Sequence, residues 1–321
     1  MTYTSGGLIQ ATDYNGFVST NANANVNDVW STGSSDKGWG QTALATVSAT
    51  NTITATQWAS LVNTIASMGS HTGTAITARS APTTGQTIGI LSALNTDLTN
   101  ITTNRLNAVA QGSQYTGWTG TNSKTTTTSG APWTITFTNT VTFASASAAR
   151  YFFNAGGSIK LDVAKSSTGQ TGDPEWNDLS STLCGDIYFT AGTGTQTIAG
   201  VSYTGTTKIG GTGVPNILTT TTGFYDLTPG GAATIIYKQF ADTAPYTSNF
   251  IQHSVALDAT SSVLTFTTLW SASDGDPITG GTASSGATPG TAPTTICTYY
   301  PPSTTYLNNV WGTPTVAATT V

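Results

Sequence analysis

Few residues of this sequence have the side chains and spacing that catalysis requires. His71 and His253 are its only two histidines, the residue type that most readily acts as a base near neutral pH. Neither lies in a recognisable nucleophile or metal-binding motif. His71 is expected just after a helix C-terminus, where a protonated ring would favour the helix dipole, and His253 lies in an alternating strand pattern. We therefore predict structural roles for both.

Two stretches gather acidic residues. "TGDPEWNDL" holds Asp173, Glu175 and Asp178, and "SDGDP" holds Asp274 and Asp276. A glycosidase uses two carboxylates, and Ca²⁺ prefers oxygen ligands. Neither stretch fits a complete calcium loop, and turn formation by Asp, Pro and Gly explains both. We predict no catalytic residue, no cofactor and no metal, and calcium binding stays open as the alternative.

The two cysteines, Cys184 and Cys297, lie far apart in the sequence, with no CxxC motif and no neighbouring histidine. This spacing argues against a metal site and leaves open whether the two are bonded.

Two tryptophans lie in or beside glycine-rich loops. Trp118 lies in "QYTGWTGTN", and Trp270 precedes "DGDPITGGTASSGATPGTAP". Exposed rings in such loops can form platforms for sugars, or they can pack at subunit contacts, which is the favoured interpretation. Binding of a host surface glycan is therefore the alternative function.

The composition limits the possible partners. The chain has 321 residues, of which 37% are hydrophobic, so it can bury a core. Only 7% are charged, against about 25% in ordinary soluble domains. Its nine Lys and Arg residues are scattered and the net charge is −5, which argues against nucleic-acid binding. We find no pattern of a signal peptide or membrane span, and expect neither conventional secretion nor a membrane partner.

Residues 1–111 are expected to form a helical region. Apolar spacing predicts a helix from an N-cap at Thr12 to Trp30, interrupted at "NANAN". A second helix should begin with a capping box of Thr54 and Gln57 and end at Gly69. Between these helices, "DKGWGQT" predicts a tight turn in which two glycines flank Trp39.

A third helix is predicted within "GILSALNTDLTNITTNRLNAV". Leu91, Leu94, Leu98 and Ile101 recur at spacings of three and four residues. They form either the buried face of a bundle helix or the interface of a homo-oligomer. We expect a trimer with this segment at or near its axis.

The second half of the chain has the pattern of β-structure. Residues 112–131 are expected to be a Gly/Thr-rich linker. Residues 132–321 contain about eight strand-like runs such as "WTITFTNTVTF", in which apolar residues alternate with threonine. The predicted fold class is α+β and mainly β, with the N-terminal helical region followed by an antiparallel β-sandwich resembling a jelly roll.

An aromatic cluster interrupts the polar sequence at "ARYFFNAGGS". Ser145 is a candidate N-cap for a short helix carrying Arg150, Tyr151, Phe152 and Phe153, and Asn154 and Gly156 favour its termination. We predict that these side chains close one end of the sandwich as a packing plug, and that Arg150 pairs structurally rather than binding a ligand.

Two blocks of the sequence resemble virion structural proteins of tailed bacteriophages, particularly those of cyanobacteria. The blocks are residues 9–71, with "ATDYN", "GWGQ" and "ITATQW", and residues 141–179, with "ARYFFNAGG" followed by "EWNDL". The resemblance implies a tail-associated or fibre-like component that assembles with other virion proteins in the host cytoplasm and is released by lysis. It implies no catalytic residue.

Overall fold

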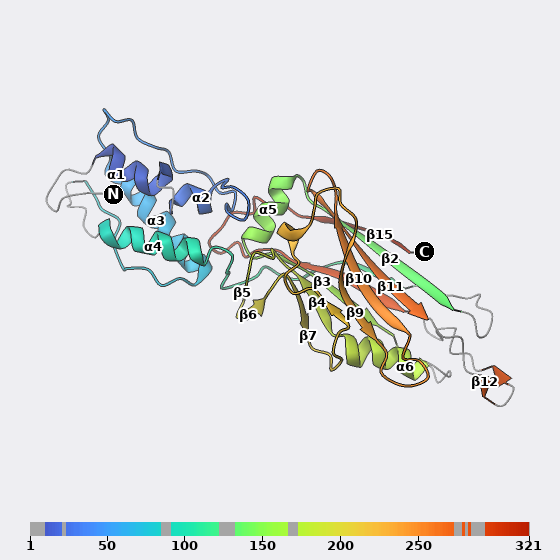
Figure 1. Cartoon of the computed structure of the whole chain (residues 1–321). Helices are drawn as coiled ribbons and strands as arrows, with labels where there is room; N and C mark the ends of the chain where they lie inside the picture. Colours follow the sequence, from blue (N-terminus) through green and yellow to red (C-terminus); the bar gives the residue numbers. More distant parts are fainter. Residues whose placement is uncertain are drawn as a thin grey trace.

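In the computed structural model the chain is elongated, with helices at one end and a β-sandwich at the other (Figure 1). The structure describes residues 10–20, 24–84, 91–121, 132–165, 173–272, 278–279, 282–283 and 293–320. The predicted α+β, mainly-β fold with antiparallel sheets and an N-terminal helical region is confirmed. The jelly-roll connectivity stays a prediction.

The first predicted helix is broken, as "NANAN" suggested, into three short elements. These are α1 (Ala11–Asn15), the π-helical turn η1 (Gly16–Thr20) and α2 (Val26–Trp30). The predicted N-cap at Thr12 is wrong. The helix begins at Ala11 because the Asp13 carboxylate accepts the main-chain N–H of Gln10, at 3.0 Å, and so fixes the N-cap at Gln10, two residues earlier.

Helix α3 (Ala55–Thr72) begins with the predicted capping box between Thr54 and Gln57. The predicted end at Gly69 is wrong, because the helix continues for another turn and ends at Gly73, with φ +68°. Gly69 instead allows a close approach: a Cβ there would lie 2.9 Å from Cγ2 of Ile76. The glycine that ends this helix is the one with left-handed backbone geometry.

Helix α4 (Leu91–Thr103) is the predicted third helix. Leu94 is 1% exposed, and Leu98 and Ile101 are 0% exposed, within the core of a single chain. Nothing is described of the Leu91 side chain. The expectation that this apolar face of the helix contacts a partner is therefore corrected for these three residues: α4 packs on α3, and the three side chains belong to the core of a single chain.

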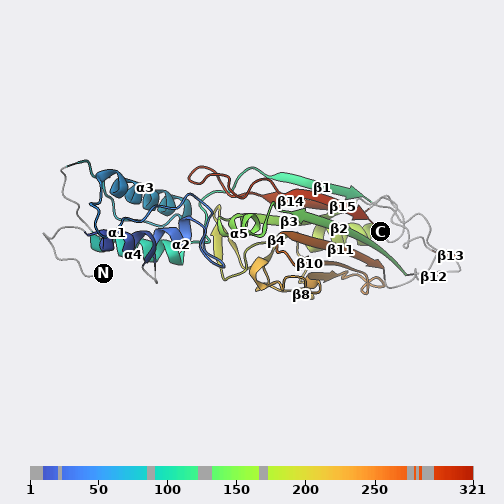
Figure 2. The same ribbon diagram turned by 90° about the horizontal axis from the view of Figure 1, so that it is seen from above.

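The sandwich consists of two antiparallel sheets (Figure 2). The strands of the five-stranded sheet, in spatial order, are β1 (Tyr115–Thr121), β14 (Thr294–Tyr300), β3 (Ser158–Ala164), β4 (Asp186–Phe189) and β7 (Thr206–Ile209). Those of the six-stranded sheet are β15 (Thr315–Thr320), β2 (Trp133–Thr142), β11 (Val263–Ala272), β10 (Phe250–Leu257), β9 (Thr234–Phe240) and β8 (Ile217–Leu218). Two hairpins, β5 (Gln196–Ile198) with β6 (Val201–Tyr203) and β12 (Ile278–Thr279) with β13 (Thr282–Ala283), are separate.

The prediction that residues 112–131 form a linker is wrong for part of that segment. Residues 115–121 pair with β14 from Tyr115↔Tyr299 to Thr121↔Thr294 and form the edge of the five-stranded sheet. Threonine and aromatic residues have high β-propensity, and the free edge of β14 supplies partners for their main-chain groups. Residues 122–131 lie outside the described part of the chain.

The core lies between the sheets and continues into the helical region. Phe189 and Phe266 meet from opposite sheets, with ring centroids 5.4 Å apart. One connected cluster of buried side chains includes Trp58 of α3, Phe153 and Trp270. The helical end and the sandwich therefore share a single core. No helix in the described ranges combines the length and apolar character needed to cross a membrane.

Candidate functional site

The candidate site is a joint between the helical region and the sandwich, built around helix α5 (Ala146–Asn154). The predicted N-cap is confirmed: the Ser145 hydroxyl accepts the N–H of Ala148 at 3.1 Å. The helix ends at Ala155, and Gly156 takes the left-handed conformation, with φ +92°. A Cβ on Gly157 would lie 2.5 Å from the ring of Phe152, so the turn packs directly against the helix.

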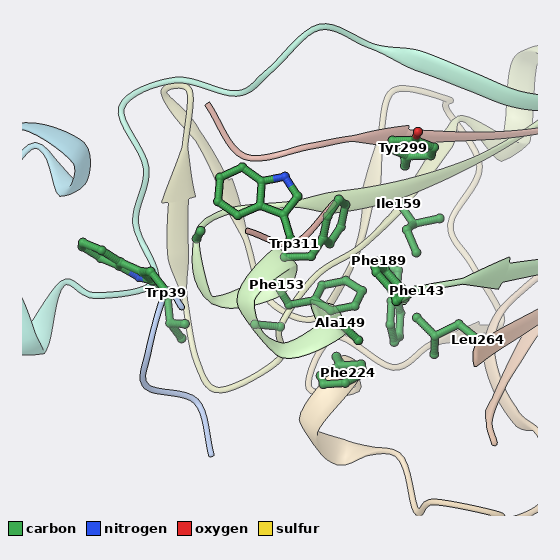
Figure 3. Packing of buried hydrophobic residues seen from close by; sticks show 14 of the residues in the cluster. Trp39, Phe143, Ala149, Phe153, Ile159, Phe189, Phe224, Leu264, Tyr299 and Trp311 are labelled. Atoms are coloured by element: carbon green, nitrogen blue, oxygen red, sulfur yellow. The ribbon is translucent and has the colours of Figure 1, made fainter. Parts of the chain in front are cut away.

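Phe153 of α5 lies among the buried side chains at the end of the sandwich, near Phe189 and Phe224 (Figure 3). Phe152 and Phe153 are fully buried, and Tyr151 is partly buried. The ring of Phe153 stacks on Phe224 at 4.7 Å and meets Phe189 of β4 edge-on at 6.1 Å. Aromatic pairs in these geometries add to the stability gained by burying their area.

The "GWG" turn of the helical region contacts the other side of α5. The indole N–H of Trp39 is shared between two main-chain oxygens, those of Arg105 at 3.2 Å and Asn154 at 3.1 Å. Gly38 and Gly40 have φ of +88° and +73°, as the tight-turn prediction required. A Cβ on Gly40 would lie 2.4 Å from the ring of Tyr151, so this glycine permits the contact between the two segments.

Asn154 joins three segments of the chain. Its amide nitrogen donates to the main-chain oxygens of Lys37 and Gly38, both at 3.0 Å. Its amide oxygen accepts the hydroxyl of Tyr225 at 2.6 Å, and the same hydroxyl lies 2.8 Å from the main-chain oxygen of Ser35. Burial raises the pKa of Tyr225, so the phenol stays protonated and keeps this donor.

Arg150 donates hydrogen bonds to main-chain oxygens rather than to a carboxylate. Its Nη2 donates to the oxygens of Thr32, at 2.5 Å, and Lys37, at 3.4 Å. The helical region is therefore fixed on the sandwich by directional hydrogen bonds as well as by aromatic packing. These contacts join two distant stretches of the sequence, "GWGQ" at residues 38–41 and "ARYFFNAGG" at residues 149–157.

Both histidines are buried. His71 lies in the last turn of α3 rather than beyond it, with its ring centroid 4.8 Å from that of Trp39. Burial lowers its pKa to about 4, opposed by a hydrogen bond to the main chain of Ala155. Burial therefore favours the neutral ring of His71, because a buried charge is disfavoured. His253 lies between the sheets, where burial lowers its pKa to about 3, and its Nδ1 is 2.9 Å from Oγ1 of Thr268.

The structure describes only some of the acidic side chains in "TGDPEWNDL" and "SDGDP". Glu175 is buried in α6 (Asp173–Asn177), and burial and the nearby charges of Asp242 and Asp178 raise its pKa. Asp178 begins the π-helical η2 (Asp178–Cys184), whereas the Asp173 side chain, Asp274 and Asp276 lie outside the description. Within the described ranges, no three His, Cys, Asp or Glu side chains are grouped so that they could hold a metal ion.

The cysteines and the loop tryptophans have structural surroundings. Cys184 and Cys297 are free and buried, and burial raises the pKa of each thiol to about 12. The hypothesis that Trp270 forms a sugar platform is wrong, because this residue is 0% exposed. Its ring centroid lies 5.7 Å from that of Trp176, and its Nε1 donates to Oγ1 of Thr295 at 3.4 Å. Strand alternation turns it toward the core. Nothing is described of the Trp118 side chain.

Sequence reasoning missed a polar and aromatic cluster on the outer face of the five-stranded sheet. Lys160 Nζ lies 3.2 Å from Asp186 Oδ2 and 3.7 Å from Asp162 Oδ2. The ring of Tyr188 lies 5.3 Å from that of Tyr203 and 6.2 Å from that of Tyr300. The alternation in "SIKLDV" and "DIYF" was a usable signal, because buried Leu161 and Ile187 point inward and their neighbours must point outward.

No protein-family model, curated protein or solved structure matches the chain.

Proposed function

We propose that this chain is a non-enzymatic structural component of a tailed-phage virion, of the kind found in cyanophages. It would be tail-, neck- or baseplate-associated, or fibre-like. The observation that supports this most is the joint: the two blocks that resemble phage virion proteins meet through Gly40 and through the contact of Trp39 with Asn154, residues 115 positions apart.

The joint suits a component that must hold a fixed shape. Two of its hydrogen bonds, from Trp39 to Asn154 and from Asn154 to Gly38, are fully buried, and such bonds are costly to break without new partners. A hinge would need weaker, solvent-exposed contacts. We propose that the helical end docks to the particle and that the sandwich faces outward or packs on neighbouring subunits.

The proposed partners are other virion proteins and further copies of this chain, with a trimer favoured. Because Leu94, Leu98 and Ile101 are buried within one chain, the contacts between copies must come mainly from the sandwich. The net charge of −5 supports neither nucleic acid nor an anionic membrane as a partner. The proposed location is the virion, assembled in the host cytoplasm and released by lysis, and no cofactor is proposed.

Mass spectrometry of purified virions tests this function. The protein should be present in washed particles at a constant ratio to the other structural proteins, and immunogold labelling should place it on the tail rather than on the head. Presence in infected lysate but absence from particles would overturn the proposal. Labelling over the head surface would instead favour a capsid decoration protein.

A host-glycan adhesin is the second candidate, favoured by the half-buried Tyr188 and Tyr300 beside Lys160, which pack against the buried Tyr203. Tyrosine rings stack on sugar faces, and the carboxylates of Asp162 and Asp186, 32% and 34% exposed, can accept sugar hydroxyls.

A glycan array tests this candidate. Saturable binding should be lost on replacing Tyr300 with Ala and kept on replacing Tyr306, a tyrosine elsewhere on the surface that is 40% exposed. Equal loss in both variants, or no binding by the unmodified protein, would remove this candidate.

A further inference from the structure

A pocket of about 340 Å³ opens beside the joint. Its walls come from the start of α5, the 3₁₀ turn η3 (Phe224–Asp226) with the segment after it, and the turn that follows β10. The lining residues are Ala146, Arg150, Phe224, Tyr225, Leu227, Pro229, Leu257 and Ser261. The volume lies at the small end of the range of ligand sites, roughly 300–1,000 Å³, so it fits a group no larger than a small molecule or one side chain.

The walls are apolar and carry one cation. Phe224, Leu227 and Leu257 are buried hydrophobic residues that also contribute to the core, and Pro229 adds to the apolar lining. Arg150 is the only Lys or Arg among the lining residues. A site of this composition selects a ligand that is mainly apolar and bears one group complementary to the cation.

The charge of Arg150 is not neutralised by a carboxylate in the described part of the chain. Of the five described ion pairs none includes Arg150, and the nearby Asp36 pairs with Arg105 instead. The guanidinium of Arg150 donates from Nη2 to two main-chain oxygens and also hydrogen-bonds the hydroxyl of Tyr225, and none of these acceptors is a carboxylate. A guanidinium has five N–H donors and commonly pairs with a carboxylate, so this one has unused capacity beside an apolar pocket.

We propose that the pocket binds an apolar group that carries a carboxylate, with the apolar part against Phe224, Leu227 and Leu257 and the carboxylate on Arg150. The N-terminal end of α5, at Ala146, adds favourable polarity at the same edge. A free aliphatic acid and the C-terminal residue of another polypeptide share this chemistry. Binding here is independent of the virion role proposed above.

The test uses two matched pairs of probes on the full chain. Hexanoate is compared with hexanamide, and the peptide acetyl-Gly-Gly-Leu with a free carboxylate is compared with its C-terminal amide. Binding is followed by the chemical shifts of the Tyr225, Leu227 and Ser261 amides at constant ionic strength. Within at least one pair the acid should bind about tenfold or more tightly than the amide, as expected for a hydrogen bond to a charged group.

Three variants assign the binding to this pocket. Arg150→Gln should remove the preference for the acid. Ala146→Leu fills the pocket and should abolish binding, whereas Ala144→Leu, an exposed neighbour outside the lining, should leave it unchanged. Ala146→Leu keeps the test decisive if Arg150→Gln disturbs the joint, because Ala146 has no side-chain group that takes part in the joint's hydrogen bonds.

The two pairs distinguish the sources of the ligand. Binding of hexanoate alone identifies a small acid, and tighter binding of the peptide acid identifies a chain terminus. The proposal is overturned if neither acid binds saturably, if each amide binds as tightly as its acid, or if Ala146→Leu binds like the unmodified protein.

Discussion

The indole nitrogen of Trp39 lies 3.1 Å from the main-chain oxygen of Asn154, a contact between residues 115 positions apart. The amide of Asn154 returns two hydrogen bonds to the turn that holds Trp39, at Lys37 and Gly38. Each segment therefore fixes the conformation of the other.

Replacing Trp39 with Phe should lower the free energy of unfolding by about 1–3 kcal/mol, because it leaves two buried main-chain oxygens without their donor. Trp30→Phe is the matched control: its indole also donates to a main-chain oxygen, that of Thr42, but at an exposed position. Trp30→Phe should lower the free energy of unfolding by clearly less than Trp39→Phe. Urea denaturation measures the free energy of unfolding of both variants. Equal losses would show that the hydrogen bonds of Trp39 in the joint stabilise the protein no more than the exposed one of Trp30.

Replacing Leu94 and Leu98 together with Asp should unfold the helical region, because both side chains lie in the core of a single chain and an isolated buried charge is strongly disfavoured. Thr96→Asp with Asn100→Asp puts the same two charges at the same spacing on the exposed face of α4 and should leave the helix intact.

Circular dichroism and light scattering distinguish the outcomes for α4. The core variant should lose helicity, and the surface variant should keep it. If the core variant instead kept its helicity while an oligomer dissociated, Leu94 and Leu98 would face a partner, and the single-chain packing would be wrong.

The buried histidines should make the protein sensitive to acid. Their folded-state pKa values, about 4 for His71 and about 3 for His253, lie below the unfolded value of 6.5. Between these values the unfolded chain binds protons that the folded chain does not. The stabilising contribution is therefore present above pH 6.5 and is lost as the pH falls, with a slope of up to about 1.4 kcal/mol per pH unit for each histidine.

The variant His253→Gln should reduce this slope relative to the unmodified protein between pH 6 and 4. The comparison between proteins is essential, because Asp162 and Glu175 have raised pKa values and contribute with the opposite sign in the acid range. Urea denaturation at a series of pH values measures the difference. Parallel curves for the two proteins would show that His253 does not titrate on unfolding.

The isolated protein should self-associate at modest concentration, because few charges oppose contact and β15 is an open edge of the six-stranded sheet. Ala317→Lys places a charge on that edge and should reduce association. Val214→Lys adds the same charge at a loop residue that is 85% exposed and is not on an edge. Sedimentation velocity should show the larger effect for Ala317→Lys, and an ideal monomer at all concentrations would contradict the prediction.

The sequence by itself determined the local elements of this fold. Alternation of apolar and threonine residues identified the strands β2, β3, β9, β10, β11 and β14, because a strand with one buried face must show that period. The caps of α3 and α5 at Thr54 and Ser145 were also readable, since capping bonds span only three residues. The glycines beside Trp39 predicted the turn they form.

Only the tertiary structure decided what those elements contact. The apolar residues of α4 have the same spacing whether they pack on helices of their own chain or on another chain. The burial of Leu94, Leu98 and Ile101 shows that they pack within their own chain. The threonine-rich stretch at Tyr115–Thr121 looked like a linker because an edge strand depends on the partner that pairs with it. The meeting of the "GWG" turn with α5 depends on contacts between distant segments, which no local pattern records, and the tertiary structure alone shows that Trp39 and Asn154 form one joint.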